Sequence, residues 1–268
     1  MTSFLIHYAI GLGLCSALMG IAFLLYLKTQ QVASADLVWG PGIFGVGLIS
    51  AIRLEANSPL HWIILGVVGL WAFRLSSFLF ATRFLRKKPE KRFDKILNSW
   101  GPNHHFNVFK NYQLQAFFQS LIAMPLLLLP VISYSPRPFF YILTLSLLAI
   151  LGETIADTQL FKFSKDPKTK PNSVCEQGLW AYSRHPNCFF DWLFWFSIAM
   201  MSFGTGYWGL SMMGPLVLLW MFLKVTIPIT EENSLVNRPD YLDYKARVSR
   251  FVPFPPRQTP KTPQQEAT

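Results

Sequence analysis

Long apolar stretches are the feature that most constrains the fold of this chain. A helix that crosses a bilayer needs about 20 mostly apolar residues, and the sequence offers seven such segments: 4–26, 36–52, 60–82, 113–133, 136–160, 187–205 and 208–229. Hydrophobic residues make up 51% of the chain and charged residues only 14%, a balance that few soluble domains of this length have. The sequence therefore predicts an all-α integral membrane protein with seven transmembrane helices, in the inner membrane if its source is bacterial.

The basic residues predict the orientation of these helices. With the amino terminus outside, every Lys and Arg except Arg53, Arg74 and Arg137 falls at the inside ends of the spans or in the inside segments. This is the positive-inside pattern, and it places the C-terminus in the cytosol. The net charge of +10 is thereby explained by topology, so no nucleic-acid partner is expected. Any soluble ligand should meet the long inside segments at 83–112, 161–186 and 230–268.

The rest of the chain predicts one membrane domain over residues 1–256 and a disordered tail over 257–268, where "RQTPKTPQQEAT" is polar and contains Pro. The first apolar stretch has no basic n-region and no clear small-residue cleavage site, so it is expected to be a span and not a signal peptide. The three cysteines, Cys15, Cys175 and Cys188, are too scattered for a zinc site or a disulfide framework.

A polar motif, "YSRHPNCFFDW" at 182–192, stands where the sixth span begins. Pro186 suits the first turn of a helix, and Ser183 is a candidate cap. Asn187 and the aspartate four residues later then share one helix face. A helix N-terminus with Arg184 and His185 beside it favours an anion such as phosphate or carboxylate. The alternative is that these groups only cap the helix at the headgroup level.

Two further polar clusters lie near the inside ends of other spans. Glu153 and Asp157 are four residues apart in "ILGETIADTQLFKF", and carboxylates inside a membrane are functional candidates because they are costly there. The alternative for this pair is an ion pair with a neighbouring helix. The segment after the last span holds Glu231, Glu232, Tyr241, Tyr244, Arg247 and Arg250. As a plain amphipathic helix on the membrane surface, that segment would need no ligand.

Together these stretches resemble the steroid 5α-reductase family, in particular its bacterial members. The resemblance lies in "GLWAYSRHPNCFFDWLFW" and "RPDYLDYKARVSRFVPFPP", while "NYQLQAFFQ" is similar to the family's fourth span. It covers residues 36–256 and is strongest over 150–256. Family members have seven spans and bind NADPH near the cytosolic side. The same residues also resemble isoprenylcysteine carboxyl methyltransferases and related lipid methyltransferases, which use S-adenosylmethionine. The number of spans and the match of the N-terminal half favour the reductases.

The resemblance implies transfer of a hydride from NADPH to the β-carbon of a conjugated enone in a steroid-like or isoprenoid lipid. The nicotinamide or ribose would be held by Asn187, Asp191, Asp157 and Tyr244, and the phosphates by basic residues. In full, the resemblance and the polar motifs assign cofactor binding to Arg86, Lys88, Asn111, Glu153, Asp157, Lys165, Tyr182, Ser183, Arg184, His185, Asn187, Asp191, Glu231, Tyr244 and Arg247. A lipid- or sterol-binding protein without enzymatic activity is a third reading.

The enone carbonyl needs a hydrogen-bond donor as the enolate develops. The family uses a glutamate near the start of the second span and a tyrosine in the third. Asp36 fits the first role, since burial would favour the protonated form that donates. The tyrosine is missing, because the chain reads "GLWAFRL" at that place, so Trp71 and Tyr112 are the other catalytic candidates. The alternative for Asp36 is a helix cap.

Overall fold

The computed structural model describes residues 2–56, 58–85, 101, 104–131, 136–170 and 172–257. Within these ranges the chain is helical and forms no β-strand, only an isolated bridge between Ser183 and Ser249. Contacts divide it into two compact units. Unit 1 comprises Met1–Leu147 and Trp195–Trp220, and unit 2 comprises Leu148–Phe194 and Met221–Thr268. The all-α prediction is confirmed for the described residues, and the assignment of one domain to 1–256 stays a prediction.

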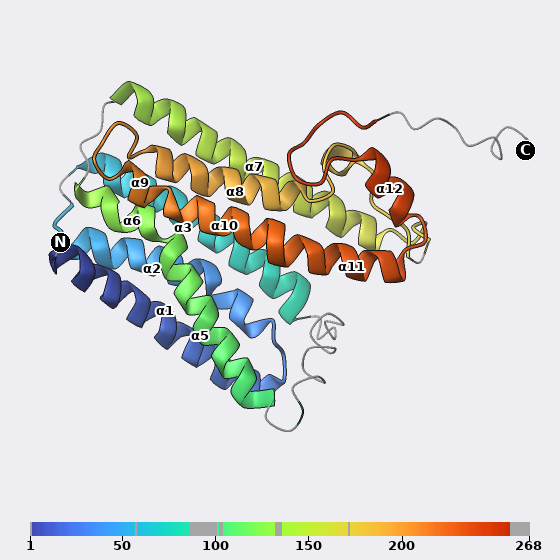
Figure 1. Cartoon of the computed structure of the whole chain (residues 1–268), viewed down its shortest axis with the longest axis horizontal. Helices are drawn as coiled ribbons and strands as arrows, with labels where there is room; N and C mark the ends of the chain where they lie inside the picture. Colours follow the sequence, from blue (N-terminus) through green and yellow to red (C-terminus); the bar gives the residue numbers. More distant parts are fainter. Residues whose placement is uncertain are drawn as a thin grey trace, which may run out of the picture. The chain divides into compact units, whose positions relative to one another are not determined.

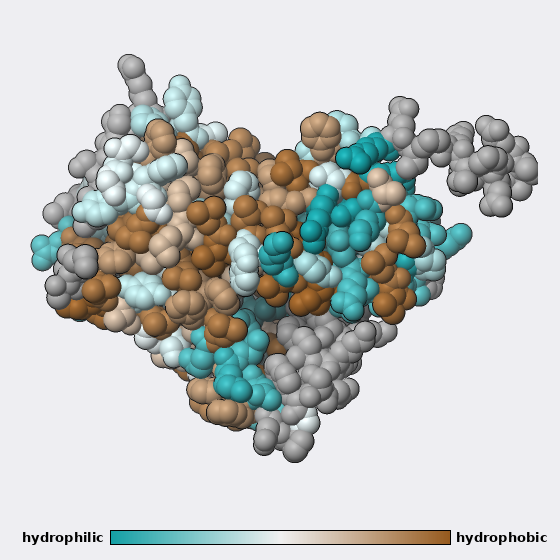
Figure 2. All heavy atoms as spheres, in the orientation of Figure 1, coloured by the Kyte–Doolittle hydropathy of each residue, from teal (hydrophilic) through white to brown (hydrophobic). Residues whose placement is uncertain are grey.

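Five helical segments among the described residues are long and apolar enough to cross a membrane. They are Phe4–Thr29, Ser34–Arg53, Pro59–Phe84, Pro138–Lys165 and Trp208–Asn237. The chain therefore has the character of a multi-pass integral membrane protein. Apolar side chains cover much of the face seen in Figure 2, and hydrophilic ones gather where α12 lies. The predicted orientation of the termini stays a prediction.

The fourth and sixth predicted spans differ from these five. The fourth, 113–133, is divided between α5 (His104–Ile122), α6 (Met124–Leu128) and the short 3₁₀-helix Leu129–Val131. The break lies at Ala123, just before Pro125, whose ring nitrogen has no N–H to continue the helix. The sixth corresponds to α8 (Pro186–Met200), whose 15 residues extend about 22 Å. This length is less than the hydrocarbon thickness of about 30 Å.

Unit 1 is built around α2 (Ser34–Arg53), which packs against α1 (Thr2–Thr29), α3 (Pro59–Leu79) and α5. Figure 1 shows α1, α2 and α5 side by side. A π-helix, Phe80–Phe84, extends α3, and the unit also contains α9 (Trp208–Ser211) and most of α10 (Met213–Met221). This arrangement makes α2 the helix that most neighbours touch.

Glycines let α2 and α3 approach closely. A Cβ atom at Gly40 would lie 2.9 Å from the backbone of Ala72, and one at Gly47 would lie 3.0 Å from the side chain of Leu65. Small residues at helix contacts are common in membrane proteins because close packing replaces the hydrophobic driving force there. The two contacts also show that α2 and α3 run antiparallel.

Unit 2 contains the second half of α7 (Pro136–Lys165), a 3₁₀-turn over Gly178–Ala181 and the first half of α8. After Met221 the chain continues as a π-helix, Phe222–Thr226, then α11 (Ile227–Asn237) and α12 (Tyr241–Arg247). An extended segment follows α12 and runs to Arg257. This unit holds all three of the polar clusters that the sequence singled out.

Candidate anion-binding site

The turn before α8 is held in place by α7. Gly178 has φ +58°, and a Cβ there would collide with the side-chain amide of Gln159. The side-chain oxygen Oε1 of Gln159 accepts a hydrogen bond from the backbone N–H of Leu179 at 3.0 Å, and the indole N–H of Trp180 donates to the backbone carbonyl of Ala156 at 2.9 Å. Because two hydrogen bonds join this turn to α7, the turn holds the beginning of the polar motif that follows in place.

The C-terminal segment pairs with this motif over several residues. The N–H of Arg184 donates to the carbonyl of Ser249 at 2.8 Å, and the hydroxyl of Ser183 donates to the carbonyl of Phe251 at 2.7 Å. Further on, the N–H of Phe254 donates to the carbonyl of Tyr182 at 2.9 Å. Residues some 70 positions apart in the sequence thus form one polar layer in unit 2.

The start of α8 agrees with its sequence prediction. The helix begins at Pro186, and the Ser183 hydroxyl accepts the N–H of His185 at 3.1 Å. The side-chain amide of Asn187 donates to Asp157 Oδ1 on α7 at 3.2 Å. The polar motif therefore does cap the helix, and it also joins the first two polar clusters.

Glu231 on α11 is the centre of a buried charge cluster. Its Oε1 lies 2.8 Å from Nε of Arg184 and 3.5 Å from Nε2 of His185. Its Oε2 lies 3.9 Å from Nε of Arg250 and 4.0 Å from Nζ of Lys245. The cluster joins α11, the start of α8 and the C-terminal segment around a single carboxylate.

Burial changes the protonation of groups in this cluster. Burial lowers the pKa of His185, although the nearby Glu231 carboxylate acts in the opposite direction. Burial and the charge of Glu231 together raise the pKa of Tyr241 to about 12. The pKa of Tyr244 is also raised, chiefly by burial. At neutral pH the positive charge of the cluster thus resides on its arginines and lysine, with His185 neutral.

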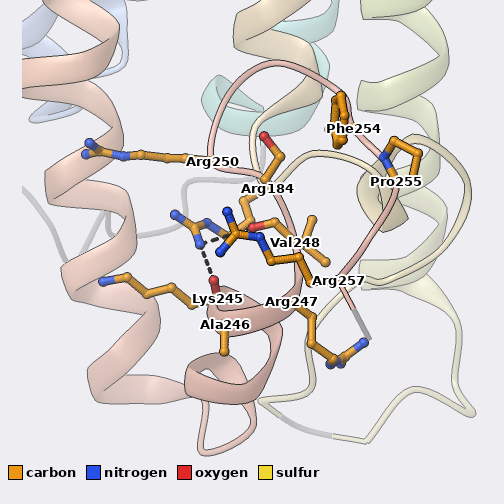
Figure 3. A pocket seen from close by; sticks show the side chains of 10 residues that line it. Arg184, Lys245, Ala246, Arg247, Val248, Arg250, Phe254, Pro255 and Arg257 are labelled. Atoms are coloured by element: carbon orange, nitrogen blue, oxygen red, sulfur yellow. Dashed lines mark hydrogen bonds between the residues drawn. The ribbon is translucent and has the colours of Figure 1, made fainter. Parts of the chain in front are cut away.

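A pocket of about 430 Å³ opens beside the cluster. Its lining residues come from the turn before α8, from the end of α12 and from the extended segment after α12: Arg184, Lys245, Ala246, Arg247, Val248, Ser249, Arg250, Phe254, Pro255 and Arg257. In Figure 3, Arg250 and Lys245 extend to one side and Arg247 points away from them. No carboxylate lines this pocket. Two lie just behind it, since Glu231 pairs with Arg184 and Glu176 with Arg247 at 2.8 Å.

Arg184 makes several bonds to other groups of the protein, whereas the sequence suggested only a role in binding the cofactor. Its NH1 donates to the carbonyls of Lys245 at 2.6 Å and Val248 at 3.3 Å, while its Nε contacts Glu231. The hydroxyl of Tyr244 is likewise bound to backbone, donating to the carbonyl of Trp180 at 2.7 Å. Both residues hold the pocket wall in place, which is a structural task in addition to the predicted one.

The other predicted cofactor residues lie in several places. Glu153 and Asp157 are buried on α7, and Asp191 lies one turn beyond Asn187 on α8. Lys165 and Tyr182 are exposed in unit 2. Asn111 lies on α5 in unit 1, where its side-chain oxygen accepts a hydrogen bond from Gln115 at 2.7 Å. Arg86 and Lys88 lie outside the described residues.

The predicted catalytic residues all lie in unit 1. Asp36, in the first turn of α2, accepts a hydrogen bond from NH1 of Arg83 at 2.6 Å. Trp71 is fully buried edge-on against Trp195, with ring centroids 5.0 Å apart. Tyr112 is also fully buried. Asp36 is thus the acceptor in an ion pair, whereas the sequence suggested a donor.

Sequence reasoning missed Lys245, Phe254 and Arg257 as pocket residues, and Arg83 as the partner of Asp36. Lys245, Arg247, Arg250 and Arg257 are spaced at two, three and seven residues, which matches no single helix face. They converge because α12 ends at Arg247 and the chain continues extended. The density of basic residues over 245–257 was the available signal.

A family model described as "Protein of unknown function (DUF1295)" matches residues 22–248. The chain belongs to the DUF1295 family. The DUF1295 match begins within α1 and ends directly after α12, so it takes in Asp36, Glu231 and Arg184. No curated protein and no solved structure matches this DUF1295 chain.

Proposed function

We propose that this DUF1295 protein is an integral membrane enzyme that uses NADPH to reduce the C=C bond of a conjugated enone in a steroid-like or isoprenoid lipid. The proposal includes seven membrane spans, an outside N-terminus and a cytosolic C-terminus. The resemblance of residues 150–256 to steroid 5α-reductases suggests the reaction. The observation that carries the proposal is the basic pocket of unit 2.

The charge of the pocket favours a phosphate-bearing cofactor. Five of the ten lining residues are Lys or Arg, and none is Asp or Glu. NADPH carries a pyrophosphate and a 2′-phosphate, and guanidinium groups bind phosphate through charge-assisted hydrogen bonds. S-adenosylmethionine carries a cationic sulfonium and one carboxylate, so a pocket with this charge would repel its reacting group. The methyltransferase reading is therefore the weaker of the two.

The residues of unit 2 fit distinct parts of the cofactor. Arg247, Arg250 and Arg257 would hold phosphate, since they line the pocket. Asn187 and Asp157, hydrogen-bonded to each other, present amide and carboxylate groups suited to a ribose or carboxamide. When bound, the cofactor supplies the hydride. Arg184 and Glu231 would orient the site through their buried pair.

Polarisation of the carbonyl is assigned to the pair of Asp36 and Arg83. Because Asp36 accepts a hydrogen bond from Arg83, the guanidinium is the donor of the pair. A positive donor would stabilise negative charge on the enolate oxygen, and Asp36 would hold it in place. Tyr112 is less suited, since its hydroxyl already donates to the carbonyl of Val32 at 3.0 Å.

The test compares cofactor binding and turnover in the detergent-solubilised protein. NADPH should raise the thermal unfolding midpoint, S-adenosylmethionine should not, and NADPH should be oxidised with a Δ4-3-oxo-steroid, another sterol enone or a polyprenoid enone. Arg257→Ala should weaken NADPH binding about tenfold, the scale of one charge-assisted hydrogen bond. Arg53→Ala removes an exposed charge in unit 1 and serves as the control.

Two results would overturn the proposal. Stabilisation by S-adenosylmethionine and not by NADPH would make the protein a methyltransferase. Stabilisation by an enone or sterol alone, with neither cofactor bound, would make it a lipid-binding protein without this activity.

A further inference from the structure

The helix α2 contains a proline at its eighth position, and this leaves one backbone carbonyl without its helical donor. Pro41 has no N–H, so the carbonyl of Leu37, four residues earlier, has no helical donor. In a membrane helix such groups must find partners within the protein, because lipid offers none. The first turn of α2, which carries Asp36, ends one turn before Pro41.

Side chains from two neighbouring helices donate to the carbonyls just before Pro41. The hydroxyl of Ser76 on α3 donates to the carbonyl of Leu37 at 3.3 Å. The amide Nε2 of Gln119 on α5 donates to the next two carbonyls, those of Val38 at 3.2 Å and Trp39 at 3.0 Å. Three consecutive carbonyls before Pro41 therefore accept hydrogen bonds from side chains of other helices, and of the three only that of Leu37 loses its helical donor to the proline.

The side chain of Gln119 is confined where it makes these hydrogen bonds. Its side chain is fully buried, and a Cβ atom at Gly42 would lie 3.2 Å from both of its amide heavy atoms. Since two carbonyls face it, the amide nitrogen and not the oxygen must point at α2. A side chain at position 42 would therefore require the Gln119 amide to shift by a few tenths of an ångström.

The same face of α5 holds α2 at a second point. Tyr112, seven residues and so two turns before Gln119, donates to the carbonyl of Val32 at 3.0 Å and bonds the hydroxyl of Ser34 at 2.9 Å. Its partners, Val32 just before α2 and Ser34 at the first residue of α2, precede those of Gln119 along the chain, so α2 and α5 run parallel here. Asp36 lies between these two points of attachment.

We propose that Gln119 is a positioning residue that holds the α2 backbone just before Pro41 and thereby fixes where the first turn of α2 presents Asp36 to Arg83. Tyr112 fixes the beginning of this turn, Gln119 fixes its end, and the carboxylate is carried between them. The relevance to catalysis rests on the proposed function, in which the Asp36–Arg83 pair polarises the substrate. The locking itself does not depend on any activity.

The first experiment is a double-mutant cycle measured by thermal unfolding in detergent. Gln119→Leu keeps bulk but removes the donor, and it should lower the midpoint by about 5 °C, since buried carbonyls lose a partner. Pro41→Ala restores the N–H only for Leu37, so in that background the loss caused by Ser76→Ala should fall to less than half, whereas Gln119→Leu should keep its effect because its partners are Val38 and Trp39. A change of less than about 1 °C for Gln119→Leu would overturn its proposed role.

The second experiment reads the place of Asp36 directly. Asp36→Cys and Arg83→Cys are combined in a chain in which Cys15, Cys175 and Cys188 are changed to Ala, and a short bifunctional thiol reagent links them well below the unfolding midpoint. Adding Gln119→Leu should slow cross-linking at least threefold. Gln115→Leu, whose amide donates to Asn111 in the same helix, should leave the rate unchanged. An unchanged rate with Gln119→Leu would show that this residue only stabilises the fold.

These outcomes are separable from those of the proposed function. If Gln119→Leu changes neither the unfolding midpoint nor the cross-linking rate while the protein oxidises NADPH, Gln119 is not a positioning residue and the proposed reductase function is unaffected. If Gln119→Leu changes both and the protein does not oxidise NADPH, the positioning role is supported and the proposed reductase function is contradicted.

Discussion

Arg184 Nε lies 2.8 Å from Glu231 Oε1, and each of the two side chains is only 7% exposed. A buried charge that loses its partner is strongly unfavourable, so each residue depends on the other. Because Arg184 also donates to two carbonyls of the C-terminal segment, this pair joins α11, the start of α8 and the pocket wall. The order of the basic pocket should therefore depend on one carboxylate.

Glu231→Gln should destabilise the protein by about 3–5 kcal/mol, the range for removing one partner of a buried pair. The measurement is thermal or denaturant unfolding in detergent. Glu232→Gln removes an exposed neighbouring carboxylate and should change stability by less than about 0.5 kcal/mol. Equal effects of the two variants would contradict the central place given to Glu231.

His185 should make stability depend on pH. Its pKa in the folded protein lies below the ordinary value of 6.5 because burial disfavours the charged ring, so the unfolded chain binds the proton more readily. Stability contributed by neutral His185 should then be lost as pH falls through 6.5 toward the folded-state pKa. As the pH is lowered from about 7.5 to 5, the unfolding midpoint of the wild type should decrease relative to that of His185→Gln. A difference that stays constant or grows over this range would show that His185 is not buried neutral.

Gly178→Ala should be more harmful than Gly204→Ala. Both glycines have positive φ, +58° and +79°, so both substitutions strain the backbone by about 1–2 kcal/mol. Only at Gly178 would the new methyl group also meet Gln159, whereas nothing lies within 4 Å at Gly204. The unfolding midpoint of each variant gives the comparison. Similar losses at the two positions would mean that α7 does not hold the turn as tightly as the contacts indicate.

Asp36→Asn should leave NADPH affinity unchanged, because the cofactor is assigned to unit 2, and should slow enone reduction about 10²-fold. The asparagine cannot carry the charge that holds Arg83. Single-turnover NADPH oxidation at saturating enone measures this, with the exposed Asp166→Asn as the control. Rates equal to wild type would remove Asp36 from the mechanism.

The predicted topology can be tested with single cysteines in a cysteine-free background. Cysteines replacing Lys168 and Arg247 should react with an impermeant thiol reagent from the cytosolic side, since both belong to inside segments. A cysteine at Arg53 should react from the opposite side. Labelling of positions 168 and 247 from different sides would disprove the proposed arrangement of spans.

The sequence by itself determined the class of the fold and the location of the polar clusters. Apolar runs of about 20 residues and a one-sided distribution of Lys and Arg are properties of composition along the chain, so they indicate membrane helices without knowledge of contacts. The start of α8 was likewise local, because Ser183 and Pro186 act within a few residues of each other. The DUF1295 family model matches residues 22–248, which include most of these signals.

Only the tertiary structure decided which charges meet. Glu231 and Arg184 are 47 residues apart, as are Asp36 and Arg83, and no periodicity pairs them. The extended segment after α12 brings Arg250 and Arg257 to one pocket, and the packing of α5 against α2 brings Gln119 to the carbonyls of Val38 and Trp39. Side-chain charges and amides act over a few ångströms, so their partners depend on how helices pack, which residue spacing along the chain does not specify.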